Sequence, residues 1–499
     1  MKFQQLLDHK LFYLLLVIVV FFAFAKLGSE EVHQWDEART GVNAVDMIKN
    51  GDIINLHFAG EPDKIRAKPP FVVWMVATNF QLFGYNRFSL RIHSALATIA
   101  IFLLLYQIII LYKSHLFAFA TCLTLIPTRA IVGFHVGRTG DFDAVLIAFI
   151  LAGLWQFLRY LDFDKKKAIY WAALLWGLAF FTKGPAMGVL FPGLAIYVLM
   201  RARLGSMLSQ KSTYWAVGLL LAFPIAWYSI IAFFGTQLDD PLVSGQNAFE
   251  RMFLYDLRDR FTQTEFEGKI EEADPFFFFN TLSITYRYWH WVFYAVCVWG
   301  IVAIIRQREK LFGENGFVMQ KEWQLLFLSV PVWFFLGLFL SIATVTKTWY
   351  LSPAVPFVAI TTVYGFDALI KYFKYSPHIF LALLVFTFMM RFLGPKGIRY
   401  EFNPGNEDFN TELITQFTSE LRESETIHQI GEWPAQRVLL WIYFENLNIN
   451  YLKSPTKLAD IPSGELVFTR NTYLDEQKPQ FSSFELIGKD ENYAILRKE

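Results

Sequence analysis

Repeated apolar runs, each about as long as a helix that crosses a bilayer, constrain this chain more than any other feature. A hydrocarbon core about 30 Å thick needs about 20 apolar residues in helical form. Hydrophobic residues make up 55% of the chain, and its mean hydropathy is +0.34. Runs of the required kind lie at residues 11–27, 89–112, 115–134, 142–160, 168–182, 185–200, 213–234, 286–305, 324–341, 352–370 and 377–393. The sequence therefore predicts a polytopic α-helical membrane protein with about eleven spans.

Basic residues gather in alternate connections between these runs, and this alternation predicts the orientation of the chain. One side receives Lys2, Lys10, Lys113, Lys165, Lys166, Lys167, Arg201, Arg203, Lys211, Arg306, Arg308, Lys310, Lys371 and Lys374. Cytoplasmic loops carry the excess of Lys and Arg, so we expect this side, with the N-terminus, to be cytoplasmic and the membrane to be the inner (plasma) membrane. The outer side then receives residues 28–88, 135–141, 183–184, 235–285, 342–351 and everything after 394. No small-x-small cleavage site follows the first run, so we expect an uncleaved anchor.

Charge and composition argue against several other classes of protein. The formal net charge of +1 offers no basic field for nucleic acid. Cys122 and Cys297 both lie in apolar runs, so no disulfide framework is expected. No glycine-rich phosphate loop is present, which argues against a nucleotide-driven pump. The outer histidines His33, His57 and His290 lack the spacing of metal ligands, and the residues themselves predict no metal site.

The composition becomes more polar after Pro395. Short apolar runs that read as strands lie at residues 437–444, 465–470, 484–488 and 493–497, and residues 410–423 read as a helix. We therefore expect a transmembrane domain over residues 1–394, with outer loops 28–88 and 235–285, and a small extracytoplasmic α/β domain over residues 395–499. Residues 69–84 are apolar but short, which favours a helix lying along the outer interface.

Two acidic groups stand where outer segments meet predicted spans. They are D-E-A-R, which contains Asp36 and Glu37, and R-T-G-D-F-D, which contains Asp141 and Asp143. Taken alone, either group is explained as a helix start, because acidic residues in a first turn complement the helix dipole. Two such groups on one side indicate a functional site there, because ionisable groups near bilayer depth are costly and usually mark substrate paths. These four carboxylates are the candidate catalytic residues.

Basic residues at the ends of the outer spans are candidates for binding a phosphate. They are Lys68, Lys183, Arg260 and Lys347, and Tyr350 adds a hydroxyl at the same level. Any one of the cations could simply snorkel to the membrane surface. Together they could hold one phosphate group, since Arg offers a fork of donors and Lys a compact charge.

The order of these motifs resembles a known family. DEARTGVNAVDMIKNGD, AKPP, LFG-x-N-x-x-S-L-R-I (residues 82–92), RTGDFDAVL, LAFFTKGP and KTWYLSPAVP follow one another over residues 30–360. In this order they resemble the polyprenyl-phosphate-sugar-dependent glycosyltransferases of GT-C fold, within which the chain is similar to bacterial protein-mannosyltransferase-like enzymes and lipid A aminoarabinose transferases. The resemblance implies a sugar transferred from a polyprenyl-phosphate donor to a lipid, glycan or protein acceptor at the outer membrane face.

The resemblance also implies roles for matching residues. Asp36 would activate the acceptor, and Asp143, or less directly Asp141, would be the second acidic residue. The group near the donor phosphate would comprise Arg39, Lys68, Arg260 and Tyr350, which Lys347 joins by its position. The aminoarabinose branch usually has Glu before K-P-P and a His in its third-loop motif, where a metal is thought to sit. Here those places hold Ala67 and YDLRDRF (residues 255–261), so a metal site of that form is not expected, and a divalent metal of another form stays open.

Two other functions remain as alternatives. A transporter or flippase of lipid-linked sugars would also have many spans, but it should show internal repeats and charges near the midplane, and neither is evident. A ligase of surface polysaccharide would share the outward-facing cations and the lipid-phosphate substrate. It would more naturally lack the D-E-A-R and K-P-P motifs.

Overall fold

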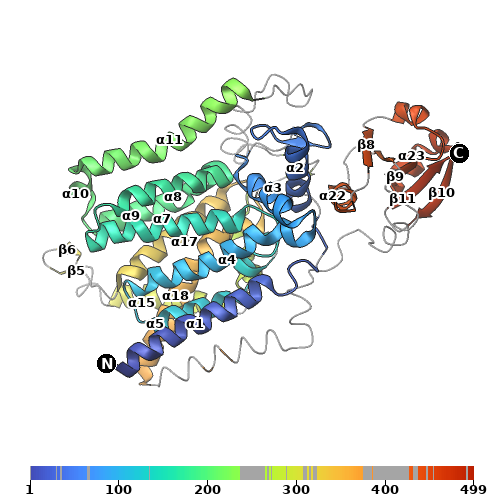
Figure 1. Cartoon of the computed structure of the whole chain (residues 1–499). Coiled ribbons are helices and arrows are strands. Elements are labelled where there is room, and N and C mark those ends of the chain that lie inside the picture. Colours follow the sequence, from blue (N-terminus) through green and yellow to red (C-terminus); the bar gives the residue numbers. More distant parts are fainter. Residues whose placement is uncertain are drawn as a thin grey trace. The chain divides into compact units, whose positions relative to one another are not determined.

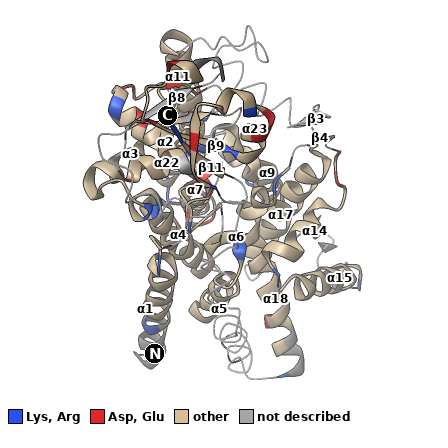
Figure 2. Cartoon of the chain, turned by 90° about the vertical axis from the view of Figure 1, so that its right-hand side faces the viewer, with Lys and Arg blue, Asp and Glu red and all other residues tan. Residues whose placement is uncertain are grey.

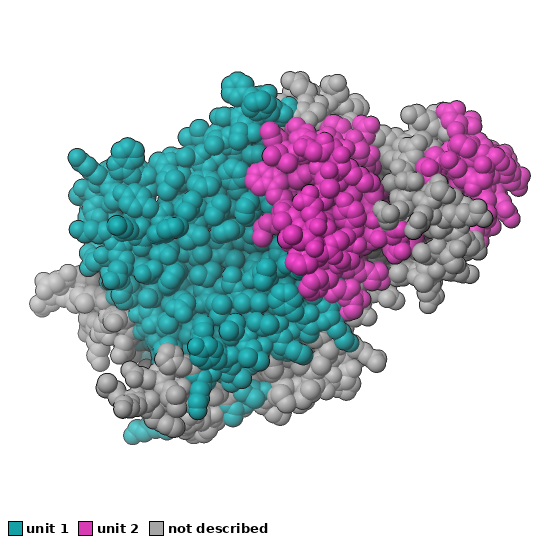
Figure 3. Space-filling model, viewed as in Figure 1, with its two compact units in different colours: residues 1–27, 64–72, 91–403 teal, residues 28–63, 73–90, 404–499 magenta. Residues whose placement is uncertain are grey.

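The chain divides into two compact units, which Figure 3 colours teal and magenta. Unit 1 comprises residues 1–27, 64–72 and 91–403, and unit 2 comprises residues 28–63, 73–90 and 404–499. The computed structural model describes residues 2–29, 31–33, 36–63, 68–133, 135–235, 265–266, 269–270, 272–287, 289–306, 312–313, 316–317, 323–344, 346–374, 382, 385, 426–430, 436–445, 448–452, 455–489 and 493–499. The expected division of the chain at residue 395 stays a prediction.

Unit 1 is a bundle of apolar helices (Figure 1). Its described elements are α1 (Lys2–Phe24), α4 (Arg87–Ile110, from Arg91 on), α5 (His115–Leu125), α6 (Arg129–Val132), α7 (Asp143–Phe163), α8 (Ala168–Lys183), η1 (Gly184–Leu190), α9 (Phe191–Met200), α10 (Leu204–Leu208), α11 (Lys211–Phe234), β3 (Glu265–Phe266), β4 (Lys269–Ile270), α14 (Phe277–Thr285), α15 (His290–Arg306), β5 (Phe312–Gly313), β6 (Gly316–Phe317), α17 (Gln324–Ile342), η4 (Thr348–Ala354) and α18 (Val355–Phe373). Helix α7 packs on α8, α8 on α11, α9 on α17, and α17 on α18. The long helices are tan along most of their length in Figure 2, because they carry few charged residues.

Five described helical stretches are long and apolar enough to cross a membrane. They are α4, α7, the continuous stretch Ala168–Met200 that contains α8 and α9, α11 and α17. Shorter apolar helices cover parts of the predicted spans 11–27, 115–134 and 286–305, and α18 covers most of span 352–370. The last predicted span, 377–393, lies almost wholly outside the described residues. The predicted class, a polytopic α-helical membrane protein, is confirmed.

Small residues let helices of unit 1 approach closely. A Cβ atom built on Gly193 of α9 would lie 2.5 Å from the Cα of Val332 in α17. No side chain larger than hydrogen fits at that contact, as is usual where helices pack closely in membranes.

A buried carboxylate holds the C-terminal part of α7. Asp162 accepts hydrogen bonds from the hydroxyls of Tyr112 and Tyr197 at 2.6 and 2.7 Å, and from the guanidinium of Arg201 at 2.8 Å. Tyr112 lies just after α4, Tyr197 lies in α9 and Arg201 directly follows α9, so α7 is tied to the ends of both helices. This fixes the helix whose other end carries Asp143.

Unit 2 contains α2 (Asp36–Asn50), the β1 (His57–Phe58) and β2 (Glu61–Pro62) hairpin, most of α3 (Phe71–Phe83) and the C-terminal part of the chain. Helix α3 is the short apolar helix expected over residues 69–84. Eleven consecutive residues of α2, Glu37–Met47, are buried. A run this long includes every side of a helix, so α2 is enclosed rather than lying on a surface.

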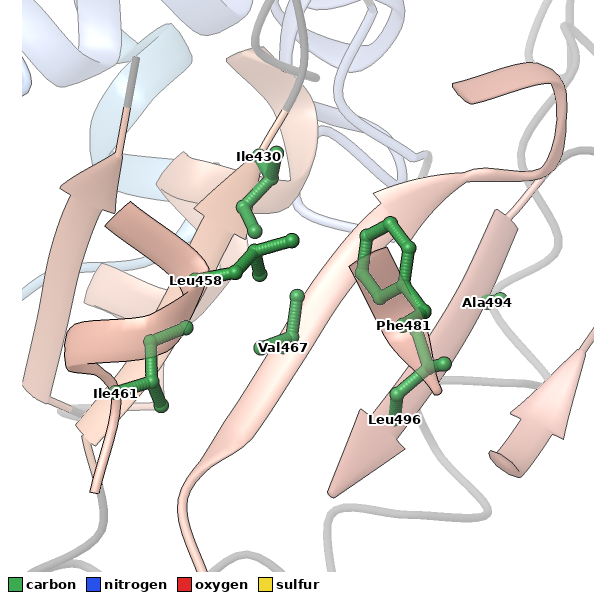
Figure 4. Close-up of a cluster of buried hydrophobic side chains, with 7 residues drawn as sticks. All are labelled: Ile430, Leu458, Ile461, Val467, Phe481, Ala494 and Leu496. Carbon is green, nitrogen blue, oxygen red and sulfur yellow. The ribbon is translucent and has the colours of Figure 1, made fainter. Parts of the chain in front are cut away.

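The C-terminal part of unit 2 is a five-stranded mixed sheet with helices. Its elements are β7 (Thr426–Ile430), α22 (Gln436–Phe444), β8 (Asn448–Leu452), η5 (Pro455–Asp460), β9 (Leu466–Arg470), α23 (Asn471–Glu476), η6 (Lys478–Phe481), β10 (Phe484–Lys489) and β11 (Tyr493–Lys498), in the strand order β10-β11-β9-β7-β8. Seven buried apolar residues form the core in Figure 4: Ile430, Leu458, Ile461, Val467, Phe481, Ala494 and Leu496. The small α/β fold and the strands at 465–470, 484–488 and 493–497 are confirmed.

The expected strand at residues 437–444 is wrong, because this segment is the helix α22. Strands β7 and β8 are parallel neighbours, and parallel neighbours need a crossover connection, which α22 supplies. The buried residues Leu439, Leu440, Ile442 and Tyr443 also have helical spacing. The helix expected at residues 410–423 lies outside the described residues.

Candidate active site

Two helix ends of unit 1 bring a buried carboxylate and a buried ammonium group together. Asp143 is the first residue of α7, and Lys183 is the last residue of α8. The Nζ of Lys183 lies 2.7 and 2.8 Å from the two carboxylate oxygens of Asp143, so the ammonium bridges both oxygens. Each charge also complements the dipole of its own helix. The two charges compensate each other in a place where neither is well hydrated.

His135 lies beside this pair and beside Asp141. Its Nδ1 is 3.6 Å from Oδ1 of Asp141 and 3.9 Å from Oδ2 of Asp143. The ring stacks on Trp349 of η4 with a centroid distance of 3.7 Å and an interplanar angle of 5°. The backbone of His135 has φ of +66°, a strained conformation that non-glycine residues adopt mostly where surrounding structure enforces it, often at functional sites. The imidazole is therefore held between two carboxylates and an indole.

The loop that carries His135 and Asp141 is anchored from two directions. The side chains of His93 and Ser94 on α4 lie 3.2 and 3.3 Å from the backbone oxygen of Asp141. Arg138 is buried and donates to two carbonyl oxygens near the end of α1, both at 2.8 Å. Arg138 thus satisfies the last carbonyls of a helix, a usual place for a cation.

Tyr350, Lys68 and Lys347 are all half-buried residues of unit 1. The Nζ of Lys183 lies 5.3 Å from the ring centroid of Tyr350, and the Nζ of Lys68 lies 5.0 Å from that of Phe142. Lys347 directly precedes η4, the element that carries Tyr350. Tyr350 therefore joins the Lys183–Asp143 ion pair and the stacked ring of His135 in one cluster. Lys68 lies against Phe142, the residue between Asp141 and Asp143.

In unit 2, the first turn of α2 carries Asp36 and Glu37. Glu37 is buried, and its Oε2 accepts a hydrogen bond of 2.8 Å from the backbone N–H of His33. This contact ties the chain before the helix to its first turn. Asp36 is half-buried instead. The neighbouring carboxylates therefore differ: Glu37 closes the helix start, and Asp36 keeps part of its surface accessible.

Arg39 forms a buried ion pair with Asp63. Its Nε donates to Oδ2 of Asp63 at 2.9 Å, a second nitrogen contacts Oδ1, and its guanidinium lies 4.5 Å from the ring centroid of Phe58. Asn43 donates to the same carboxylate at 2.8 Å. Arg39 is thus occupied by an internal partner that the sequence pattern did not predict. Its role as a phosphate ligand stays a prediction.

The structure brings together Asp141, Asp143 and Tyr350, and it adds Lys183, whose pairing with Asp143 was not expected. Sequence reasoning missed His135, Trp349, His93 and Asp63. Trp349 stands in the quoted motif KTWYLSPAVP and His135 three residues before RTGDFDAVL, but nothing in the sequence shows that their rings stack. Arg260, and the Ala67 and 255–261 positions tested for metal ligands, lie outside the described residues, and no reaction step is assigned to a metal.

Comparison with known proteins places these features in a family context. Residues 67–229 match the family model described as dolichyl-phosphate-mannose-protein mannosyltransferase. An uncharacterized protein of Aquifex aeolicus is 25% identical over 71% of this chain. That match covers 63% of the relative, so the chain spans less than two thirds of its length.

Two solved structures share the fold. ArnT from Cupriavidus metallidurans, solved bound to undecaprenyl phosphate, has a TM-score of 0.68 and 13% sequence identity, with 97% of each chain covered. The oligosaccharyltransferase AglB from Archaeoglobus fulgidus, solved with an inhibitory peptide and a dolichol-phosphate, has a TM-score of 0.51 and 13% identity, covering 87% of this chain and 64% of that one. The resemblance to membrane glycosyltransferases of GT-C fold is confirmed, and the chain is a multi-pass membrane protein with the fold of ArnT.

Proposed function

We propose that this protein is a membrane glycosyltransferase that moves a sugar from a polyprenyl-phosphate donor to an acceptor hydroxyl or phosphate at the outer membrane face. The observation that supports this most is the buried cluster of Lys183, Asp143, His135 and Asp141 at the start of a membrane-spanning helix. Buried ionisable groups at such a place are costly and usually functional. The match to the mannosyltransferase family and the fold of ArnT make glycosyl transfer the reaction that best explains the cost.

The donor phosphate is the leaving group of this reaction. Its negative charge grows as the bond between the anomeric carbon and the phosphate oxygen breaks. Cations and hydroxyls held in place before the reaction stabilise that growth, which is often the largest catalytic contribution. We assign this role to Lys68, Lys347, Tyr350 and, outside the described residues, Arg260. Lys183 is matched by Asp143, and its role is to keep that carboxylate ionised within the cluster.

The acceptor hydroxyl must lose its proton as the new bond forms. We assign the base to Asp36, whose carboxylate is half-buried, in contrast to the buried Glu37 beside it. A positioned base contributes about 10²–10⁴-fold to the rate. One base and no carboxylate nucleophile give a single displacement, with inversion at the anomeric carbon. The two-carboxylate retaining scheme of glycosidases is not required.

Purified protein in lipid, supplied with labelled polyprenyl-phosphate sugars and candidate acceptors, tests this proposal. We expect free polyprenyl phosphate and glycosylated acceptor to form in equal amounts, with the opposite anomeric configuration in the product by NMR. Movement of intact donor across the bilayer without cleavage would show a transporter instead. Mass spectrometry of surface glycans and glycolipids from cells with and without the gene would then identify the acceptor.

A further inference from the structure

Helix α22 approaches α2 of the same unit at a glycine. A Cβ atom built on Gly41 would lie 2.5 and 2.8 Å from the two terminal methyl carbons of Leu440, closer than any real contact of this kind. Leu440 is fully buried, and Gly41 is buried as well. A side chain at residue 41 would therefore force the fully buried side chain of Leu440 to move.

A polar contact joins the two helices one turn further along. The hydroxyl of Tyr443 donates to Oδ1 of Asp46 at 3.0 Å, while Oδ2 of Asp46 accepts the backbone N–H of Gly60 at 3.0 Å. The Nζ of Lys49 lies 4.1 Å from the ring centroid of Tyr443. Leu440 and Tyr443 are three residues apart and so share one face of α22. That face contacts α2 at Gly41 through Leu440 and at Asp46 through the hydroxyl of Tyr443.

These contacts act on the helix that carries the proposed base. Asp36 is the first residue of α2, and Gly41 is five residues further along, a separation of about 7.5 Å in a helix. A helix moves as a rigid element, so a shift at Gly41 or Asp46 also displaces the first turn. A misplacement of about 1 Å can cost about 10²-fold in rate even when its cause lies far from the chemistry.

We propose that α22 is a positioning element of the transfer reaction and that Leu440 and Tyr443 are positioning residues. They hold α2 where the carboxylate of Asp36 meets the acceptor hydroxyl. This inference rests on the proposed function and gives the C-terminal part of the chain a role in it, through contacts with α2. The first turn of α2 is set by a helix about 400 residues further along the chain.

A compensating pair of substitutions tests the contact in the full-length protein in lipid. Gly41→Ala introduces a methyl group that collides with Leu440, and Leu440→Ala removes the methyl groups that it meets. We expect Gly41→Ala to lower kcat about 10²-fold without changing KM for the donor. In the Leu440→Ala background, adding Gly41→Ala should lower kcat much less than it does in the wild type. Gly218→Ala is the matched control, because a Cβ on Gly218 of α11 meets nothing within 4 Å.

Two further readouts keep the test decisive if Gly41→Ala fails to fold. Tyr443→Phe removes one hydroxyl and should lower kcat several-fold, about 10-fold at most, with donor KM unchanged. Amide hydrogen exchange over residues 36–50 should rise in Gly41→Ala and return toward wild type in the double variant. Wild-type kcat in both Gly41→Ala and Tyr443→Phe, or a double variant no faster and no better protected than Gly41→Ala, would overturn the inference.

The exchange readout also separates this inference from the proposed function. If wild-type protein transfers no sugar but the exchange of α2 follows the compensating pair, the proposed function fails and α22 still positions α2. If wild type transfers sugar and neither kcat nor exchange follows the pair, the positioning role is refuted and the proposed function stands.

Discussion

The ammonium of Lys183 bridges the two carboxylate oxygens of Asp143 at 2.7 and 2.8 Å, and both residues are buried. The pair joins the C-terminus of α8 to the N-terminus of α7, and these two helices pack against each other. A buried ion pair of this kind contributes little net stability, but the loss of one partner leaves an uncompensated charge. Each of the two charges is therefore stabilised mainly by the other charge and little by water.

This dependence predicts non-additive stability in a double-mutant cycle. Lys183→Met and Asp143→Asn should each destabilise the protein by about 3–5 kcal/mol, because each leaves the other charge buried without its partner. The double variant should be more stable than Lys183→Met alone, with a coupling of about 0.5–3 kcal/mol. Thermal melting in detergent measures all four proteins. Additive losses would mean that the two charges do not compensate each other.

Asp36→Asn keeps the size of the side chain and removes the proposed base. We expect turnover to fall by about 10²–10⁴-fold while donor binding is retained. Asp143→Asn should cost less turnover if Asp143 orients the acceptor. Asp475→Asn is the control of the same chemistry, because that side chain is 70% exposed. Transfer at the wild-type rate by Asp36→Asn would leave Asp36 as a helix-start residue and place the base elsewhere.

Lys68→Ala removes a cation assigned to the donor phosphate. One charged hydrogen bond is worth about 1.5–3 kcal/mol, so donor affinity should weaken by roughly 10- to 150-fold. Lys113→Ala is the matched control, since the Nζ of Lys113 also lies over an aromatic ring, 4.3 Å from the centroid of Tyr364, but on the side predicted to be cytoplasmic. Titration with polyprenyl phosphate measures both variants. Equal affinity in Lys68→Ala and wild type would remove Lys68 from the phosphate site.

Cysteine labelling tests the predicted orientation. Ser206 and Ser482 are exposed, and they fall on the sides predicted to be cytoplasmic and external. In intact cells, a membrane-impermeant maleimide should label Ser482→Cys and spare Ser206→Cys until the membrane is opened. The unsubstituted chain measures the background from Cys122 and Cys297. The reverse pattern would invert the topology and place the proposed site in the cytoplasm.

The contact between Asp46 and Tyr443 predicts a dependence of stability on pH. Burial raises the pKa of Asp46 above its ordinary value of 3.8, although the hydrogen bonds from Gly60 and Tyr443 act in the opposite direction. Because the folded pKa is the higher one, the contribution of this group to stability is present below the unfolded value and is lost as pH rises through the folded value.

Relative to Asp46→Asn, the wild type should therefore lose stability as pH rises above about 4, the ordinary pKa of the carboxyl group. Melting curves of both proteins across this range in detergent measure the difference. A wild type that gains stability relative to Asp46→Asn on going to higher pH would show that the pKa of Asp46 is lowered by folding instead.

Local patterns in the sequence predict much of the fold. Continuous apolar runs indicate α4, α7, α11 and α17, since a span is a property of one segment and its hydropathy. The short apolar runs at residues 465–470, 484–488 and 493–497 likewise indicate the strands β9, β10 and β11. Residues 437–444 show the limit of this approach, because an apolar run of eight residues suits a strand or a short helix equally well. The parallel pairing of β7 with β8 requires the helix, and pairing is a relation between distant segments.

The candidate site divides in the same way. Its carboxylates and cations stand out in the sequence because charge beside an apolar run is costly and visible in one segment. Their pairings do not: Lys183 meets Asp143 across 40 residues, Arg39 meets Asp63 across 24, and Tyr443 meets Asp46 across 397. Sequence alone determines which residues carry charge into the membrane region and which segments can span it. Only the tertiary structure decides which charges neutralise each other, because that depends on distances between helices that no local pattern encodes.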